Sequence, residues 1–256
     1  MWNVIKLFIN KCLILLFVFP VSSHAAERII NAWTYYDMPP FVTGEGQGLV
    51  YDFVELLNGH VEGDYQFQVM IYPRKRLDSQ LEEGEQGIVL FVNWAWMGEN
   101  AKTKYLWGPV ILTDRNEIIS GTDRRVEFDG SAGSLKGLLF GGLLGRRYPG
   151  LMVAMERKEI IRVNARTEVQ NLKKILHQRI DVTTMPQSQL GYHIKNMQLD
   201  GQLHLSETPL FSYSRHLLVT KKLQSEYVFI TAFTKGLSGN NAWRIILQKY
   251  GLSQSQ

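Results

Sequence analysis

The sequence is poor in cysteine, because Cys12 is the only one among 256 residues. A single cysteine cannot form an internal disulfide, so an apolar core must stabilise the fold. After residue 25 no apolar run approaches the roughly 18 residues that a membrane-spanning helix needs. An excess of charge is also lacking, since the formal net charge is only +4. We therefore do not expect nucleic acid or an acidic surface as a partner.

Motifs for catalysis or metal binding are missing as well. The five histidines after residue 25 form no pair at the spacing of a zinc site, and no Gly-x-Ser-x-Gly elbow accompanies them. The glycine-rich stretch 137–145 does not end in Gly-Lys-Ser/Thr, so it is not a phosphate-binding loop. The carboxylates are scattered, and no Asp/Glu pair can be placed across a cleft. The sequence thus predicts no catalytic residue, no metal and no cofactor.

The first 25 residues have the pattern of an export signal. Lys6 and Lys11 form a basic start, an apolar core of about ten residues follows, and Ser23-His24-Ala25 offers small residues at a cleavage point. No cysteine stands there to carry a lipid. We expect cleavage after Ala25, with an uncleaved anchor as the alternative, and a soluble, monomeric product in the periplasm. Loss of Lys6 and Lys11 lowers the formal charge from +4 to +2.

Two segments that are 100 residues apart resemble each other. Residues 109–119 read PVILTDRNEII and residues 209–219 read PLFSYSRHLLV, with Pro and Arg in register and apolar pairs at the same offsets. Each segment follows the pattern of a strand that begins at a proline. One interpretation is that both strands carry the chain between two lobes; the alternative is a chance likeness of two strands. On the first interpretation, Arg115 and Arg215 are surface residues beside a hinge.

Strand and helix patterns alternate before each of these twin segments. Apolar periodicity and capping signals predict a βαβαβ unit in the first half and a second α/β unit after the first twin. The expected strands are 28–34, 66–72, 87–92, 135–144, 159–164, 180–184 and 202–206. The expected helices are 47–58, 73–84, 148–158, 167–178 (with Thr167 as N-cap), 187–195 and a helical region 225–250.

This order predicts an α/β protein with two lobes, each a mainly parallel sheet flanked by helices. After the signal at 1–25, residues 26–114 and 216–256 form lobe 1. Residues 115–215 form an inserted lobe 2, with hinge strands near 109–119 and 209–219. Such an architecture leaves a cleft that can hold a small molecule.

Ligands of open α/β sheets gather at the carboxyl ends of strands, and that rule selects the candidate ligand-binding residues. Aromatic rings there could stack on a flat ligand, and Arg76 and Arg146 could meet an anionic group. For each ring, core packing is the alternative interpretation. Asp37 could also only set a turn, and Arg76 could lie on a solvated helix face. The predicted site consists of Tyr35, Tyr36, Asp37, Arg76, Asn93, Trp94, Trp96, Arg146, Thr167 and Gln187.

Several short motifs, in this order and spacing, resemble the extracellular solute-binding proteins of family 3. The motifs are YYDMPPF at 35–41, GLVYDF at 48–53, YPRKRL at 72–77, LWGP at 106–109, LKG at 135–137 and RID at 179–181. The resemblance covers nearly all of the chain after the signal. It implies a type II periplasmic-binding-protein fold and a receptor for a small solute, working with an ABC permease or a membrane sensor.

The resemblance is incomplete where the family's amino-acid receptors clasp their ligand. Their Thr-x-x-Arg falls on Met97 and Asn100 here, and their second-lobe acid falls near Pro186. The resemblance therefore implies a binding protein for a small polar or aromatic-bearing solute without implying an α-amino acid. An enzyme like the family's cyclohexadienyl dehydratases is an alternative, for which only Asp37 and Glu99 could be the general acid. A ligand-sensing partner of a membrane receptor is another.

Overall fold

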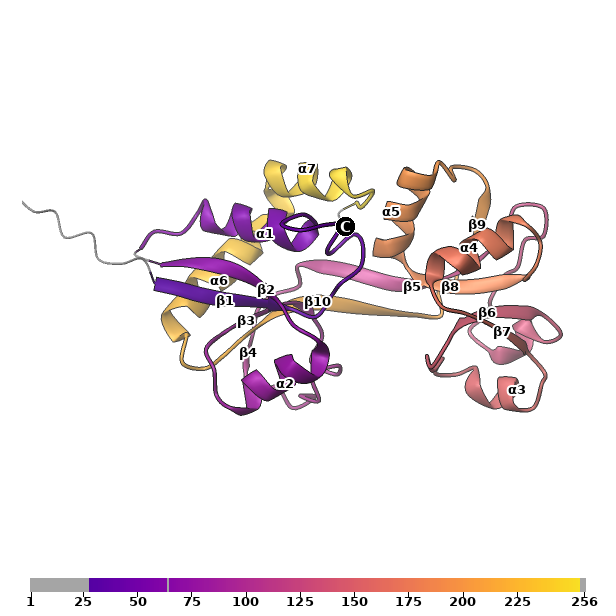
Figure 1. Ribbon diagram of the computed structural model, residues 1–256, viewed down its shortest axis with the longest axis horizontal. Helices are drawn as coiled ribbons and strands as arrows, with labels where there is room; N and C mark the ends of the chain where they lie inside the picture. The colour runs from indigo at the N-terminus through magenta and orange to yellow at the C-terminus, as the bar shows by residue number, and fades with distance from the viewer. Residues whose placement is uncertain (1–27, 64, 254–256) are drawn as a thin grey trace, which may run out of the picture.

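Alternating strands and helices form two lobes joined by a pair of long strands (Figure 1). The computed structural model describes residues 28–63 and 65–253. The expected export signal and its cleavage point lie outside these residues. Within them, no helix combines the length and the apolar composition needed to span a membrane.

Lobe 1 is built on a parallel sheet in which β1 (Arg28–Thr34) lies between β2 (Tyr65–Ile71) and β3 (Gly87–Val92). The fully buried sequence of β3 explains its central place, because both of its faces are covered. The lobe's other elements are α1 (Leu49–Asn58), α2 (Arg74–Glu82), β4 (Leu106–Trp107), α6 (Gln224–Gly236), the 3₁₀ turn Leu237–Gly239 and α7 (Asn241–Lys249).

Lobe 2 repeats the plan with β6 (Leu139–Leu143) between the parallel strands β7 (Ile161–Ala165) and β8 (Val182–Pro186). The hydroxyl of Thr167 caps α4 (Glu168–Leu176), as the sequence predicts, by accepting from the backbone N–H of Gln170. The other elements are the 3₁₀ turn Ala132–Leu135, α3 (Met152–Glu156), α5 (Gln187–Met197) and β9 (Leu203–Leu205).

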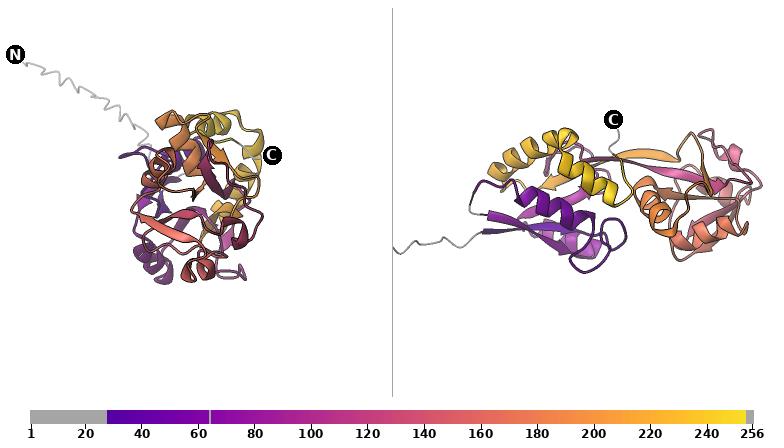
Figure 2. Two further views of the ribbon diagram at one scale, coloured as in Figure 1. Left: turned by 90° about the vertical axis from the view of Figure 1, so that its right-hand side faces the viewer. Right: turned by 90° about the horizontal axis from the view of Figure 1, so that it is seen from above.

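The twin segments form β5 (Leu112–Gly121) and β10 (Phe211–Val219), which pair with each other in antiparallel fashion. Arg215 stands opposite Leu112, and Arg115 stands opposite Ser212. One end of β10 pairs with β3 in lobe 1, and the far end of β5 pairs with β8 in lobe 2. The paired stretch, residues 112–116 and 211–215, is called the connecting ribbon below; it runs from lobe to lobe in Figures 1 and 2.

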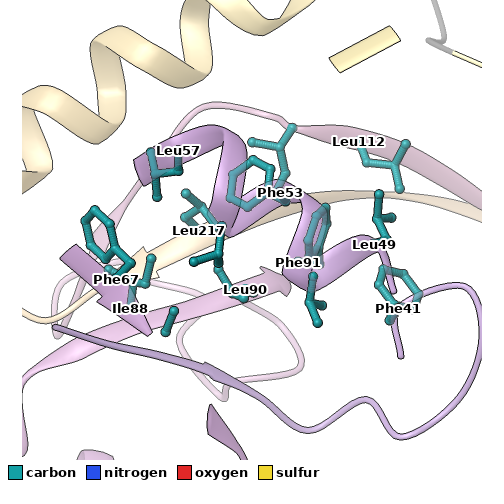
Figure 3. Packing of buried hydrophobic residues seen from close by; sticks show 14 of the residues in the cluster. Phe41, Leu49, Phe53, Leu57, Phe67, Ile88, Leu90, Phe91, Leu112 and Leu217 are labelled. Carbon is teal, nitrogen blue, oxygen red and sulfur yellow. The ribbon is translucent and has the colours of Figure 1, made fainter. Parts of the chain in front are cut away.

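The core of lobe 1 fixes the turn that faces lobe 2. Phe41 is fully buried, and its ring lies 5.5 Å from that of Phe91 at the end of β3 (Figure 3). Gly48 precedes α1 with a φ of 130°, and a Cβ there would lie 2.3 Å from the carbonyl oxygen of Phe41. Only glycine therefore lets the chain pass so close to the turn 35–41.

The lobes also touch beside the connecting ribbon. The backbone of α5 at Gly191 lies against Gly251, where a Cβ on Gly191 would come within 2.3 Å of the Gly251 carbonyl oxygen. The Lys195 ammonium donates to the carbonyl oxygens of Gln248 and Lys249. The end of α7 in lobe 1 is thus held against α5 in lobe 2.

The predicted elements agree with the structure, with small errors at their ends. The strands expected at 28–34 and 87–92 are confirmed without change. The strand expected at 135–144 is wrong at its start, because residues 132–135 form a 3₁₀ turn before β6 begins at Leu139. The helix expected at 148–158 shrinks to Met152–Glu156, since Gly150 with a φ of 84° interrupts its first turn.

Candidate functional site: a cleft between the lobes

A cavity of about 310 Å³ opens between the two lobes at the connecting ribbon. This volume lies at the lower end of the range for small-molecule sites, which starts at about 300 Å³. Lobe 1, lobe 2 and the ribbon all contribute to its lining. The lining residues are Tyr35, Tyr36, Met38, Trp96, Asn116, Arg146, Arg147, Tyr148, Pro186, Gln189, Phe211, Tyr213 and Arg215.

Aromatic rings form the side of the cleft that belongs to lobe 1 and the ribbon. The ring centroids of Tyr35 and Tyr36 are 4.7 Å apart, and Tyr36 stacks on the buried Phe41 at 4.2 Å. Trp96 meets Tyr213 edge-on at 4.9 Å. These contacts hold the rings in fixed orientations and leave them in the lining, where they can stack on a flat ligand.

A buried ion pair lies at the floor of the cleft, between β10 and β5. The Nη2 and Nε groups of Arg215 donate to Oδ2 of Asp114 at 2.7 and 3.0 Å. The two side chains are only 3% and 1% exposed. The expectation that Arg215 is a surface residue is therefore wrong: the pairing of two distant strands encloses it. Arg115, by contrast, is half-exposed and pairs with Glu117.

This ion pair connects groups from both lobes. On the lobe 1 side, Nη1 of Arg215 donates to the hydroxyl of Tyr36 at 2.7 Å and to the carbonyl oxygen of Phe91 at 3.3 Å. On the lobe 2 side, Asp114 accepts from the backbone N–H and the hydroxyl of Ser188, at 3.1 and 2.7 Å. Tyr213 donates to Asp114 at 3.2 Å. One network thus spans the cleft floor from the aromatic turn to α5.

Lobe 2 faces the cleft with Arg146 and Arg147, which follow β6. Nη1 of Arg146 donates to Glu168 in the first turn of α4 at 3.0 Å. Arg147 is exposed, and no carboxylate within the described ranges 28–63 and 65–253 lies within ion-pair distance of it. The adjacent Tyr148 is buried and accepts from the backbone N–H of Leu143, which anchors this loop.

The hydroxyls of Tyr35 and Tyr213 in the cleft remain protonated. Burial raises the pKa of Tyr35 and that of Tyr213 well above the usual range of a phenol. Both groups are therefore neutral at ordinary pH and can donate a hydrogen bond.

Four of the predicted site residues lie together in the cleft lining: Tyr35, Tyr36, Trp96 and Arg146. Asp37 is exposed and is not part of the lining, although both of its neighbours are. Arg76 lies over the ring of Tyr72 at 4.3 Å, while its neighbour Arg74 lies over Tyr35 at 5.2 Å.

The other predicted residues lie elsewhere. Trp94 packs on His216 with ring centroids 4.7 Å apart, and the Lys102 ammonium lies over its ring. Asn93 bridges the backbone, donating to the carbonyl oxygen of Ser214 and accepting from the N–H of Ala95. Thr167 caps α4, and Gln187 lines a different hollow beside α5.

The sequence-based selection missed the contribution of the second twin segment. Phe211, Tyr213 and Arg215 alternate along β10, and all three line the cleft. Their period of two is visible in the sequence, but which face meets the cleft depends on pairing with β5. Met38 and Gln189 were also missed; the amide of Gln189 contacts the sulfur of Met38 across the lobes at 3.0 Å.

Comparison with known proteins supports the architecture through structure alone. No protein-family model matches the sequence, and no curated protein matches it either. The L-cystine solute receptor of Neisseria gonorrhoeae, in its unliganded open conformation, has a TM-score of 0.66 at 12% identity, covering 89% of this chain and 94% of that one. An ancestral cationic amino acid solute-binding protein also gives 0.66 at 12% identity, covering 87% and 95%.

A third similar structure is the periplasmic VFT2 domain of Bordetella pertussis BvgS. It has a TM-score of 0.58 at 15% identity and covers 88% of this chain and 94% of that one. Identities this low show the fold alone. The chain has the two-lobed type II periplasmic-binding-protein fold that the sequence predicts.

Proposed function

We propose that this protein is a periplasmic solute-binding protein that captures a small polar or aromatic-bearing solute between its lobes and delivers it to an ABC transporter. The observation that carries the proposal is the shared cleft: rings of lobe 1, arginines of lobe 2 and side chains of the ribbon line one cavity. A solute that contacts both lobes binds best when they are close together, so it shifts the population toward a closed form.

The connecting ribbon is the proposed hinge. Within the described residues two strands link the lobes through the sheet, so rotation about residues 112–116 and 211–215 changes the lobe spacing. Such a rotation also moves the contact between α5 and the end of α7, and it leaves each lobe's own core intact. The proposed boundaries are those expected from the sequence, with lobe 2 inserted at 115–215. Export to the periplasm and action as a monomer belong to the same proposal.

A panel of solutes tests the proposal directly. Thermal shifts of the purified protein with amino acids, organic acids, polyamines and short peptides should reveal at least one stabilising class, since a ligand that binds only the folded state raises its stability. Small-angle scattering with that solute should show a smaller radius of gyration. If no solute in the panel stabilises the protein, the binding function is contradicted.

Sensing is a second candidate, because the fold that the structure shares with the periplasmic VFT2 domain of BvgS serves equally well to present a bound solute to a membrane partner. In that case the closed form would be presented to a membrane receptor. Deletion of the gene separates the two: loss of uptake of the identified solute supports transport, whereas unchanged uptake with a lost signalling response supports sensing.

The dehydratase alternative finds no support at the two acids that it needs. Glu99 is buried in lobe 1, where its carboxylate accepts from the Trp107 indole and from the backbone N–H of Thr103. Asp37 lies outside the cleft lining. Neither carboxyl is among the residues that line the cavity, so the structure offers no observation in favour of this alternative.

A further inference from the structure

The positive charges of the cleft are unequally compensated. Three guanidinium groups belong to the lining: Arg146, Arg147 and Arg215. The thirteen lining residues include no aspartate, glutamate or histidine. Two carboxylates pair with these arginines, Asp114 with Arg215 and Glu168 with Arg146.

All N–H groups of the Arg215 guanidinium already donate to acceptors within the protein. A guanidinium carries five N–H groups. Nε donates to Asp114; Nη1 donates to the hydroxyl of Tyr36 and to the carbonyl oxygen of Phe91; Nη2 donates to Asp114 and to the hydroxyl of Tyr213. An anionic ligand could bind Arg215 only by displacing one of these buried partners. The charge of Arg215 is matched by that of Asp114.

Arg146 is partly compensated and Arg147 is not. Arg146 pairs with Glu168, with side chains 39% and 16% exposed. Arg147 has no carboxylate within ion-pair distance among the described residues. Three arginines against two paired carboxylates leave one uncompensated positive charge, and it lies on lobe 2.

A ligand complementary to this cleft carries one negative charge and one flat apolar part. An ammonium group would meet no carboxylate in the lining and would face the charge of Arg147 instead. A carboxylate can accept from the guanidinium of Arg147 and from the remaining donors of Arg146. A ring can stack against Tyr35, Trp96 or Tyr213 on the opposite side.

Building on the proposed function, we propose that the solute is an aromatic monoanion without an ammonium group, of the aryl-alkyl carboxylate class. Arg147 and Arg146 hold its acid group on lobe 2, and the rings of lobe 1 and the ribbon hold its aromatic part. Arg215 keeps its protein partners throughout. The acid and the ring of one molecule thus draw the two lobes together.

Three test ligands share a phenyl ring on a short alkyl chain and differ in their charged groups. 3-Phenylpropionate carries a carboxylate, L-phenylalanine carries a carboxylate and an ammonium group, and phenethylamine carries an ammonium group without a carboxylate. In titration calorimetry with the full protein, 3-phenylpropionate should bind at least roughly tenfold more tightly than either of the others. The ammonium group of L-phenylalanine adds a repulsive contact with Arg147, and phenethylamine also lacks the charge-assisted hydrogen bond of a carboxylate.

Arg147→Gln should weaken binding of 3-phenylpropionate by roughly tenfold or more and should reduce its dependence on salt. Arg166→Gln is the matched control, because Arg166 is exposed and lines a different hollow on lobe 2, and it should leave affinity unchanged. Both variants should keep the unfolding midpoint of the parent.

Three results would overturn the assignment. The first is that L-phenylalanine or phenethylamine binds more tightly than 3-phenylpropionate, and the second is that Arg147→Gln and Arg166→Gln lose equal affinity for 3-phenylpropionate. The third is that none of the three ligands binds. The proposed function fails on a different result, which is the absence of any stabilising solute in the broad panel. If a solute of another class closes the lobes, the assignment of the ligand as an aromatic monoanion is wrong, but the proposed solute-binding function is supported.

Discussion

Lobe 1 lines the cleft with rings and no charged group, whereas lobe 2 lines it with Arg146 and Arg147 beside the buried ring of Tyr148. Tyr35, Tyr36 and Trp96 come from loops that follow β1 and β3, and Arg146 and Arg147 come from the loop that follows β6. These loops occupy equivalent places, the carboxyl ends of parallel strands, in two sheets of the same plan. The two lobes thus share an architecture and divide the chemistry of the site between them.

The charge of the sequence is divided in the same way. With the boundaries expected from the sequence, lobe 2 has 15 Lys and Arg against 10 Asp and Glu, a formal charge of +5. Residues 26–114 and 216–256 have 11 against 14, a formal charge of −3. The small net charge of the whole chain therefore hides a basic lobe. A positive lobe beside the cleft favours the approach of anions.

The largest effect is expected where the two sides of the cleft are joined, at Arg215. Arg215→Met leaves the Asp114 carboxylate buried without its counter-charge and releases Tyr36 and Tyr213. The free energy of unfolding should fall by about 3–5 kcal/mol, the usual cost of breaking a buried ion pair. Urea unfolding followed by tryptophan fluorescence measures this change.

Two further variants check that the loss comes from the unpaired charge. Asp114→Leu combined with Arg215→Met should recover part of the lost stability, because no buried charge then remains. Arg166→Met, at an exposed position, should change stability by no more than about 0.5 kcal/mol. An Arg215→Met variant as stable as Arg166→Met would show that the ribbon does not depend on the pair.

The aromatic side can be tested with two tryptophans that are two residues apart. Trp96→Ala removes a ring from the cleft lining and should weaken the binding of 3-phenylpropionate by roughly tenfold, which corresponds to about 1.4 kcal/mol. Trp94→Ala should leave affinity unchanged and lower stability by about 2 kcal/mol, because Trp94 packs on His216 and Trp107. Calorimetry and urea unfolding of both variants separate the roles; the reverse pattern would place the site around Trp94.

The smallest effect concerns one buried carboxyl from each side, Glu99 in lobe 1 and Glu117 on the lobe 2 part of β5. Burial acts to raise the pKa of Glu99, but hydrogen bonds from Trp107, Thr103 and Tyr105 outweigh it and lower that pKa. Burial raises the pKa of Glu117, and the hydrogen bond from Arg115 only partly opposes it. One oxygen of Glu117 has no hydrogen-bond partner among the residues that the structure describes.

These opposite shifts predict opposite pH effects. Glu99 stabilises the fold above its unfolded pKa, near 4.3, and that contribution is lost as the pH falls through its lower folded pKa. The contribution of Glu117 is present below its unfolded pKa and is lost as the pH rises through its higher folded pKa. At pH 7, Glu99→Gln should therefore lower the free energy of unfolding by about 1 kcal/mol, whereas Glu117→Gln should raise the free energy of unfolding. If both substitutions change the free energy of unfolding in the same direction, the predicted opposition between the two carboxyls is contradicted.

Much of the fold could be predicted because its signals are local. The continuous apolar run of β3 and the cap at Thr167 depend only on neighbouring residues. Strand ends also indicated where Tyr35, Tyr36, Trp96 and Arg146 would lie. The burial of Arg215 could not be seen in this way, because its partner Asp114 is 101 residues away and is brought close by strand pairing. Trp94 and Trp96 both follow β3, and only the packed structure shows that Trp94 lies on His216 and Trp96 in the cleft.

The central claim is that the ring and the carboxylate of one ligand bind opposite lobes and close the cleft. Small-angle scattering of the parent protein and of Arg147→Gln, each with 3-phenylpropionate, tests this claim most directly. The ligand should lower the radius of gyration of the parent, and at the same ligand concentration it should leave that of Arg147→Gln near the unliganded value. An unchanged radius in the parent, or equal compaction of both proteins, would contradict this claim.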